Sequence, residues 1–418
     1  MKIWKRTLAA LTAAGLLATG LTACSTPAKE EPTSIDKVAG ISTDTTLFTV
    51  DGQPVTAADY CYWLTYNIDY ISSYLYNGAE PAWEDEAVND MNVAEYIKNS
   101  ALETAKTYRV VTNKATEYGC VLSAEDEATL DDRMAEMVNT YGEAEWDTAL
   151  EAGEVSEDMT DEEKTNWITE NGQVSFQKAL DAQTVTSEGL RNIAGIYLLY
   201  SETLPEKLFA EDGPYPINAE TFQAWVDENQ YYRFKHILLT TTDADGNALD
   251  DAGKAEVKAQ LQTILDDIRS SADPIAAFDN AMTQYSEDTG LTYYPDGYFA
   301  KPGEMVESVE TAALSLGIDE ISDIVESDFG YHIILRLTPD TEENRNSYQA
   351  TLYNDLFTQW VEEAQVEETE AYTNLDVATY YANLLALRAE LYPDEYTVEP
   401  EETTEPETAA PTETPASN

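Results

Sequence analysis

The sequence predicts an α+β protein in which a small sheet-bearing region is inserted into a helical domain. Apolar residues recur at helical spacing through much of the first half of the chain, and again after Pro339, where they lie four residues apart. Between these helical regions lie two short apolar runs of strand character, residues 235–239 and 330–335. A helix after Pro339 can pack on the first helices, so we interpret the strand-bearing region as an insertion.

The chain's first predicted elements are a hairpin and a capped helix. Residues 47–55 contain an Asp-Gly pair between two apolar runs, which favours a short hairpin turn. Thr56, with Asp59 three residues later, is typical of a capping box and predicts a helix over 57–76. This opening resembles the entry of extracytoplasmic foldases of the PrsA and SurA type.

Further helices are predicted before the strand-bearing region. Their apolar periodicity covers residues 93–118, 123–141 and 187–209. Residues 142–173 are acidic and poorly periodic, which leaves their structure open. Asn218 is a good N-cap for a helix over 219–228 that leads into the first strand.

The chain's only two histidines, His236 and His332, each lie in one of the strand-like runs. Alternation of side chains along a strand puts His236 on the same face as Phe234 and Leu238, and His332 on the same face as Ile334. Each imidazole therefore faces a sheet surface. On the residues alone, two unrelated core histidines that each make one hydrogen bond remain an open alternative.

Five segments follow one another in a distinctive order around these histidines. They are FKHIL at 234–238, FDNAMTQYSED at 278–288, GYF at 297–299 with GEMV at 303–306, VETAAL at 309–314, and EISDIVESDFGYHII at 320–334. Together they resemble the parvulin, or PpiC-type, family of peptidyl-prolyl cis-trans isomerases. A match of five segments in order is more specific than any single short motif.

The resemblance implies a parvulin-like domain, a small and mostly antiparallel sheet surrounded by helices, that isomerises X-Pro bonds without a cofactor or metal. Carried over by motif, the catalytic residues are His236, His332 and Asp288. The substrate-binding residues are Met305 and Phe299 in the proline pocket, Val309 in its wall, Ser327 near its rim, and Phe329 in the last turn.

Two positions differ from the family's pattern. Asp296 stands where an apolar pocket residue is expected, and Val309 stands where many members have Phe. The resemblance therefore predicts a smaller and more polar proline pocket, which would hold the proline ring less tightly.

The start of the chain predicts a secreted lipoprotein. Three cationic residues precede an apolar stretch over 8–21 that is short for a membrane-spanning helix, so residues 1–23 are interpreted as a signal peptide. The segment ending in Cys24 resembles a bacterial lipobox, which implies a lipid anchor on the Cys24 thiol. We expect residues 24–42 to be a flexible tether and the protein to sit on the outer face of the bacterial cell membrane.

The formal net charge of -57 argues against nucleic acid as a partner, because a polyanion would be repelled. The expected partners are instead unfolded or partly folded secreted polypeptides that contain proline. Cys61 and Cys120 lie in helical patterns, where buried thiols are expected, with a disulfide between them as the alternative.

The predicted domains follow from these patterns. Residues 43–229 form an N-terminal helical, chaperone-like domain, residues 230–340 form the parvulin-type domain, and residues 341–392 form C-terminal helices that pack on the N-terminal domain. Residues 393–418, at the acidic Glu-, Thr- and Pro-rich end, are expected to be disordered.

Several other interpretations stay open. The same fold could serve as a holdase chaperone with a weak or inactive isomerase domain, in which the helical domain cradles unfolded segments. An aromatic helix is open to two interpretations, a client-binding surface or core packing; it carries Tyr60, Tyr62, Trp63, Tyr66, Tyr70 and Tyr74. A solute-binding lipoprotein is disfavoured, because the chain lacks the repeated strand-helix alternation of α/β lobes.

His236, His332 and Asp288 are also chemically suited to a divalent metal. A calcium loop from Asp243 is disfavoured, because Lys254 occupies the place of its distal Glu.

Overall fold

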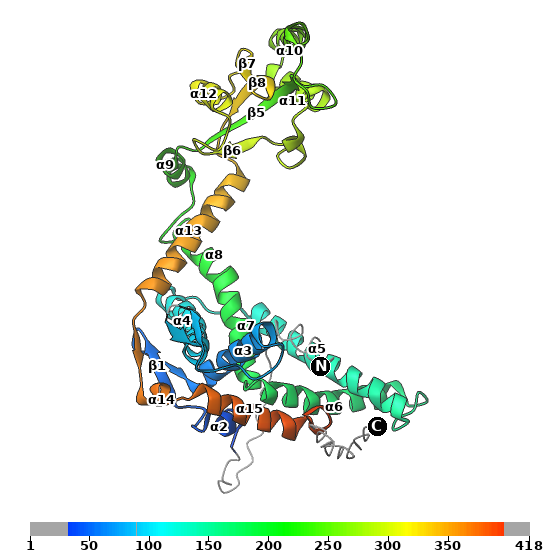
Figure 1. Ribbon diagram of the computed structural model, residues 1–418, viewed down its shortest axis with the longest axis vertical. Helices are drawn as coiled ribbons and strands as arrows, with labels where there is room; N and C mark the ends of the chain where they lie inside the picture. Colours follow the sequence, from blue (N-terminus) through cyan, green and yellow to red (C-terminus); the bar gives the residue numbers. More distant parts are fainter. Residues whose placement is uncertain (1–31, 89, 397–418) are drawn as a thin grey trace, which may run out of the picture. The chain divides into compact units, whose positions relative to one another are not determined.

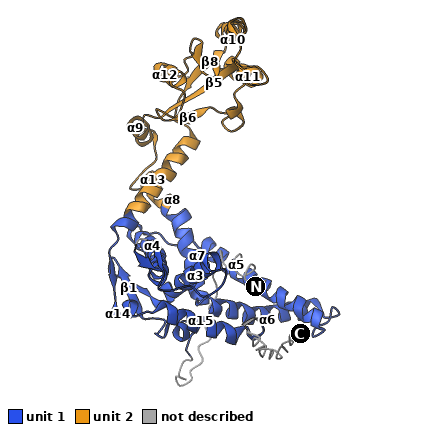
Figure 2. Cartoon of the chain, in the orientation of Figure 1, with its two compact units in different colours: residues 1–204, 360–418 blue, residues 205–359 orange. Residues whose placement is uncertain are grey.

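The structure is a computed structural model that describes residues 32–88 and 90–396, and it confirms the α+β class. The chain forms two compact units, shown in different colours in Figure 2. Unit 1 contains residues 1–204 and 360–418, and unit 2 contains residues 205–359. The predicted signal peptide, Cys24 and most of the acidic tail lie outside the described residues. None of the described helices is long and apolar enough to cross a bilayer.

Unit 1 contains a three-stranded sheet that joins the two distant parts of the sequence. Its strand order is β2 (Gln53–Thr56), β1 (Thr46–Val50) and β9 (Val366–Glu368), and both pairs are antiparallel. The hairpin between β1 and β2 is the predicted one, with Asp51 and Gly52 both at positive φ (52° and 76°). Strand β9 comes from the C-terminal segment, so that segment is part of unit 1.

The helices of unit 1 pack beside this sheet and extend away from it (Figure 1). The predicted capping box is present, since the Thr56 hydroxyl accepts a hydrogen bond from the amide of Asp59. In chain order the helices are α2 (Ser34–Ala39), α3 (Ala57–Leu75), α4 (Val93–Tyr118), α5 (Ala124–Ala152), α6 (Asp161–Ala182), α7 (Ser187–Leu198), the π-helical turn η1 (Leu199–Thr203), α14 (Glu370–Thr373), α15 (Val377–Leu391) and α16 (Pro393–Tyr396). A small hairpin, β3 (Glu86–Val88) with β4 (Met91–Asn92), precedes α4.

Two flexible segments expected from the sequence are partly ordered. The predicted tether over 24–42 is wrong for Ser34–Ala39, which form α2 with Thr33 as its cap and with Ile35 and Val38 buried. Burial of these two side chains supplies the packing that a tether would lack. The first four residues of the predicted disordered tail form α16. Cys61 and Cys120 are buried thiols rather than halves of a disulfide.

Unit 2 is built on a four-stranded antiparallel sheet. The order is β6 (Tyr298–Ala300), β5 (Tyr232–Thr240), β8 (Gly330–Leu337) and β7 (Val325–Ser327). Its helical elements are α8 (Leu204–Phe209), α9 (Ala219–Asn229), α10 (Asp251–Ser270), α11 (Pro274–Tyr285), the 3-10 turn η2 (Thr289–Thr292), α12 (Glu307–Ser315) and α13 (Glu342–Glu363), of which α8 and α13 extend across the unit boundaries. Asn218 caps α9, as predicted.

The two faces of this sheet bury different side chains, with α10 and α11 on one side and α12 on the other (Figure 1). Ile237, Ile333 and their alternate neighbours pack on α10 and α11. Phe234 and Ile334 pack on α12 instead. The sequence predicts His236 on the face of Phe234 and His332 on the face of Ile334, and the structure shows that both lie on the face that carries α12.

Unit 2 is longer at both ends than the predicted domain 230–340 because α9 and α13 attach to it through aromatic rings. Trp225 in α9 stacks on Tyr348 in α13, with ring centroids 4.7 Å apart. Trp225 also lies 4.5 Å from the ring of Tyr231, which stacks on Phe299 at 4.5 Å. These contacts connect the flanking helices to the β6 edge of the sheet.

Candidate active site

The two central strands bring both histidines together. In the antiparallel register of β5 and β8, His236 pairs with Ile334 and Leu238 pairs with His332, so the two imidazoles are diagonal neighbours on one face. Their rings lie within 10° of parallel, and the two Nδ1 atoms are 3.0 Å apart. Both side chains are buried, at 9% exposure for His236 and 2% for His332.

Asp288 and Ser327 complete a chain of hydrogen bonds through these rings. The Nε2 atom of His236 lies 2.8 Å from Oδ2 of Asp288. At the other end, Nε2 of His332 lies 2.7 Å from Oγ of Ser327, which also accepts the amide of Phe329 at 3.1 Å. All four imidazole nitrogens therefore have protein partners within this chain, apart from any substrate.

The segment that carries Asp288 is attached to β5 by backbone contacts. The amide of Glu287 donates to the carbonyl of Leu238 at 2.8 Å, and the amide of Leu238 donates to Oγ of Ser286 at 3.1 Å. Asp288 then caps η2, because its Oδ1 accepts the amide of Gly290 at 2.9 Å. These bonds fix the carboxylate beside His236.

The ionised state of Asp288 sets the direction of the first hydrogen bond in this chain. Burial opposes the charged carboxylate, but donors from His236, Tyr298 and the Gly290 amide outweigh it and hold the pKa of Asp288 well below its usual range. An ionised carboxylate only accepts, so His236 donates to it from Nε2. In the tautomer in which Nδ1 of His236 accepts, His332 donates from its Nδ1, and its Nε2 accepts the Ser327 hydroxyl proton.

Burial, and then the neighbouring His236, lower the pKa of the His332 imidazole to about 4, while Asp288 acts in the opposite direction. At neutral pH His332 is therefore uncharged, so one of its ring nitrogens donates and the other accepts. The site is a pair of imidazoles between a carboxylate and a hydroxyl.

The other residues expected in the proline pocket are placed in different surroundings. Met305 is half-buried against the cluster that contains Phe234. Val309 is only 4% exposed and belongs to that cluster, beneath the sheet face that carries the histidines. Phe329 is 60% exposed and adjoins Ser327 through its amide, whereas Asp296 is exposed in the loop before β6.

Phe299 is not brought to the histidines. Its ring stacks on Tyr231, whereas the adjacent Tyr298 pairs with Phe234 and lies on the histidine face. The phenol oxygen of Tyr298 is 2.6 Å from Oδ2 of Asp288. Sequence reasoning missed Tyr298, although alternation along β6 puts it on the opposite face from Phe299.

The arrangement of donors favours a hydrogen-bonded site over a metal centre. The His236 and His332 rings direct Nδ1 atoms at each other, and their outer nitrogens face Asp288 and Ser327. Within residues 32–88 and 90–396, no group of three or more His, Cys, Asp or Glu side chains is arranged to hold a metal ion.

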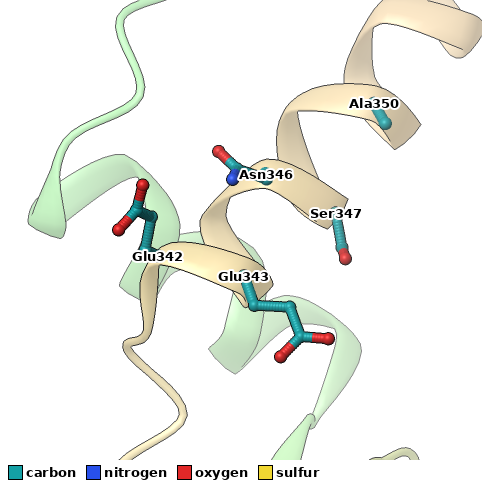
Figure 3. Close-up of a pocket in the computed structure, with 5 residues that line it drawn as sticks. All are labelled: Glu342, Glu343, Asn346, Ser347 and Ala350. Carbon is teal, nitrogen blue, oxygen red and sulfur yellow. The ribbon is translucent and has the colours of Figure 1, made fainter.

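A hollow also lies on the surface of unit 2, over the first turns of α13 (Figure 3). It is lined by Glu342, Glu343, Asn346, Ser347 and Ala350. Its two carboxylates carry like charge, and none of its lining residues takes part in the histidine chain. We therefore assign the candidate site to the sheet face and not to this hollow.

Known proteins are similar to the part of the chain that contains these residues. Residues 236–338 match the family described as Rotamase: PPIC-type PPIASE domain. The foldase protein PrsA of Halalkalibacterium halodurans is 29% identical over 209 residues, which cover 48% of this chain and 55% of that protein. Foldase protein PrsA 1 of Bacillus cereus is 31% identical over 173 residues, which cover 36% of this chain and 58% of that protein.

The chain thus spans less than two thirds of the length of these curated relatives. Among solved structures, PrsA from Bacillus subtilis aligns with 76% of this chain and 93% of its own, at 15% identity and a TM-score of 0.23.

Proposed function

We propose, from the premise that residues 236–338 belong to the PPIC-type family of peptidyl-prolyl isomerases, that this protein is a foldase. It catalyses cis-trans isomerisation of X-Pro bonds in unfolded polypeptides. The uncatalysed reaction crosses a barrier of about 18–20 kcal/mol and takes tens to hundreds of seconds, so it can limit the folding of a chain.

The observation that carries this proposal is that every imidazole nitrogen of the site already has a hydrogen-bond partner within the protein. Each nitrogen of His236 and His332 is hydrogen-bonded to another side chain of the network. A histidine that removed a proton from a substrate would need one nitrogen directed at that substrate. Rotation about an X-Pro bond transfers no proton and breaks no bond, so it needs only a shaped and preorganised surface.

The chemistry proposed for the site is preferential binding of the twisted amide. Met305 and its apolar neighbours on the α12 side supply a surface for the proline ring, and Phe329 supplies an exposed aromatic side chain near Ser327. The fixed dipoles of the histidine chain surround the amide as it loses planarity. Stabilisation that is stronger for the twisted than for the planar amide raises the rate.

The proposed clients are secreted polypeptides that contain proline, and the proposed location is the outer face of the cell membrane. This rests on the apolar stretch over 8–21 followed by the lipobox-like Cys24, and on the foldase names of the relatives. Mass spectrometry of the protein from its native membrane tests the anchor. Cys24→Ser should abolish both the lipid mass and membrane association, and an unlipidated wild-type Cys24 would contradict the location.

The enzymatic proposal is tested by refolding of a protein whose slow phase is limited by an X-Pro bond. The chain from residue 25 onward should accelerate that phase in proportion to its concentration. His236→Ala should lower the acceleration more than tenfold, an effect typical of losing one member of a hydrogen-bonded active site. Glu256→Gln, an exposed change on α10, is the matched control and should leave the rate unchanged.

A holdase without isomerase activity is the second candidate function, and one observation favours it. On α3, Tyr66, Tyr70 and Tyr74 are 43%, 44% and 71% exposed, which is unusual for a row of aromatic side chains at four-residue spacing. Suppression of aggregation of an unfolded client, with no acceleration of proline-limited refolding by the wild type, would establish the holdase and exclude the isomerase.

A further inference from the structure

We propose that Tyr298 is a positioning residue of the site, which holds Asp288 in place through its phenol, and that Gly290 supplies the space this phenol needs. This inference rests on the proposed isomerase function for its catalytic consequence. Its structural part, the coupling of Tyr298, Gly290 and Asp288, is testable without any activity.

Tyr298 is placed on the site by the β6 edge strand. Its backbone pairs with Phe234, and its ring lies 5.6 Å from the Phe234 ring at 25° and 5.5 Å from the His236 ring at 84°. The ring is therefore packed against two residues of the histidine face. Tyr294 adds a third ring contact, 5.0 Å away on the side of the preceding loop.

The phenol completes the coordination of the Asp288 carboxylate. Oδ2 accepts from Tyr298 at 2.6 Å and from Nε2 of His236 at 2.8 Å, and Oδ1 accepts the Gly290 amide at 2.9 Å. Because the carboxylate is ionised, all three donors are charge-assisted. Loss of the phenol would leave one oxygen held by His236 alone, and the carboxylate would be freer to rotate away from the imidazole.

The absence of a side chain at Gly290 leaves the space that the Tyr298 phenol occupies beside Asp288. A Cβ built on Gly290 would lie 2.0 Å from the Tyr298 phenol oxygen and 3.2 Å from Oδ1 of Asp288. The backbone of Gly290 is not in the left-handed region, unlike that of Gly297 at φ 99°. Space, and not backbone conformation, is therefore the reason for glycine at position 290.

A double-mutant cycle tests this pairing. Tyr298→Phe keeps the ring and removes the oxygen, and it should lower kcat/KM about tenfold, as expected for a lost hydrogen bond to a charged group. Gly290→Ala should lower kcat/KM by a similar factor, because its methyl group displaces the phenol. The double variant should be no worse than Tyr298→Phe alone, since the phenylalanine leaves no oxygen for the methyl group to meet.

Tyr294→Phe is the matched control. It removes a phenol from the ring next to Tyr298, at a residue that is 53% exposed, and kcat/KM should stay unchanged. Melting temperatures of all four variants are measured beside the rates, so that a general loss of folding is recognised. If Gly290→Ala fails to fold while the double variant folds, the steric conflict with the phenol is demonstrated directly.

A readout independent of activity is the titration of the Asp288 carboxyl carbon, followed by NMR. The groups that face this carboxylate are His236 from β5, Tyr298 from β6, the Gly290 amide from η2, and His332 from β8 at longer range. Tyr298→Phe should raise the pKa of Asp288, because one donor to the ionised form is lost. A purely structural tyrosine would leave this titration unchanged.

The outcomes separate the two proposals. A wild type without isomerase activity would overturn the proposed function, while the NMR titration would still decide the role of Tyr298. The positioning role is wrong if Tyr298→Phe leaves the Asp288 titration unchanged. It is also wrong if Gly290→Ala lowers kcat/KM by the same factor whether residue 298 is phenylalanine or tyrosine.

Discussion

The hydrogen bonds that His332 makes to His236 and Ser327 depend on the charge state of its buried imidazole. His332 donates to His236 and accepts from Ser327 only while it is neutral. A proton on its Nε2 would turn that atom into a donor, which could no longer accept the Ser327 hydroxyl proton. The pKa of about 4 keeps His332 neutral across the physiological range.

The stability of unit 2 should therefore fall in mild acid. The pKa of His332 is lowered from 6.5 to about 4 in the folded state, so between these values the unfolded chain binds the proton and the folded chain does not. This contribution is complete above pH 6.5 and is lost as the pH falls toward 4. It amounts to roughly 3 kcal/mol in the free energy of unfolding. Hydrogen exchange of β5 and β8 amides measures it.

The comparison with His332→Gln isolates this effect from the many carboxylates of the chain. Glutamine does not titrate, so the stability difference between wild type and variant should narrow by roughly 3 kcal/mol from pH 6.5 to pH 4. A stability difference that stays constant over this range would show that His332 has the same pKa in the folded and the unfolded chain. Isomerase activity should likewise stay level down to pH 5 and fall near pH 4.

Much of the site at this scale was predictable. The two histidines, Asp288 and Ser327 belong to segments whose order is distinctive, and the alternation along each strand predicted which strand neighbours share a face with each imidazole. That the two imidazoles lie on one face follows from the register of β5 and β8. Tyr298 was not predicted, because its strand has only three residues and alternation along it can be applied only once the bounds of that strand are known. Its role depends on Gly290, a contact between side chain and backbone that no sequence pattern encodes.

Two glycines allow a close contact between α5 and α6 in unit 1. A Cβ on Gly142 in α5 would lie 2.0 Å from the carbonyl oxygen of Ile168 in α6. A Cβ on Gly172 in α6 would lie 2.2 Å from the carbonyl oxygen of Val138. These carbonyls belong to backbone and cannot rotate away, so the two helices can approach this closely only because both positions lack a side chain.

Gly172→Ala should therefore lower the stability of unit 1. In an exposed helix this change would raise stability by about 0.5–1 kcal/mol. Here the methyl group must push two backbones apart, which should cost about 1–3 kcal/mol instead. Thermal melting followed by circular dichroism gives the sign. Glu143→Ala, at an exposed position next to Gly142, is the control and should change little, whereas a rise in melting temperature for Gly172→Ala would refute the packing argument.

These glycines also explain why the sequence alone did not predict the structure of residues 142–173. Gly142 follows a periodic stretch and resembles a helix end, but α5 continues to Ala152 and stops at Gly153, which has φ 74°. A glycine at a helix crossing and a glycine at a helix end look alike in one sequence. The hairpin at 51–52 and the capping boxes were predictable because their signals are local, whereas a crossing depends on a helix 30 residues away.

At the scale of the whole molecule, unit 1 is assembled from two segments that are separated by 155 residues of unit 2. The last long helix, α15, is joined to the first segment by a buried ion pair. Arg388 donates to both carboxylate oxygens of Asp69 at 2.8 and 2.7 Å, and its Nε donates to the carbonyl of Ala182 at 2.9 Å. Both side chains are at most 5% exposed.

Arg388→Ala should destabilise unit 1 by about 3–5 kcal/mol, because it leaves the buried Asp69 carboxylate without its counter-charge. Asp69→Leu combined with Arg388→Met should recover much of that loss, since an apolar pair of similar volume removes the charge as well. Denaturant unfolding of Arg388→Ala, of the single variants Asp69→Leu and Arg388→Met, and of the double variant measures both effects. An additive double variant would mean that the two side chains do not act as a pair.

The discontinuous unit leads to a prediction about which pieces of the chain fold alone. Removing residues 205–359 should leave a folded unit 1, whereas a chain that stops at residue 204 should not fold, because it lacks β9, α14 and α15.

The two ends to be joined both lie near the C-terminal end of α4. The Thr203 carbonyl contacts Cys120 at 3.8 Å, and the Trp360 ring is 6.1 Å from the Tyr118 ring. A flexible linker of about eight residues spans roughly 15 Å and should suffice. Circular dichroism should show a cooperative melt for the joined chain only. If residues 32–204 melt cooperatively by themselves, the C-terminal segment is an accessory to unit 1, and our interpretation of unit 2 as an insertion into one folding unit is wrong.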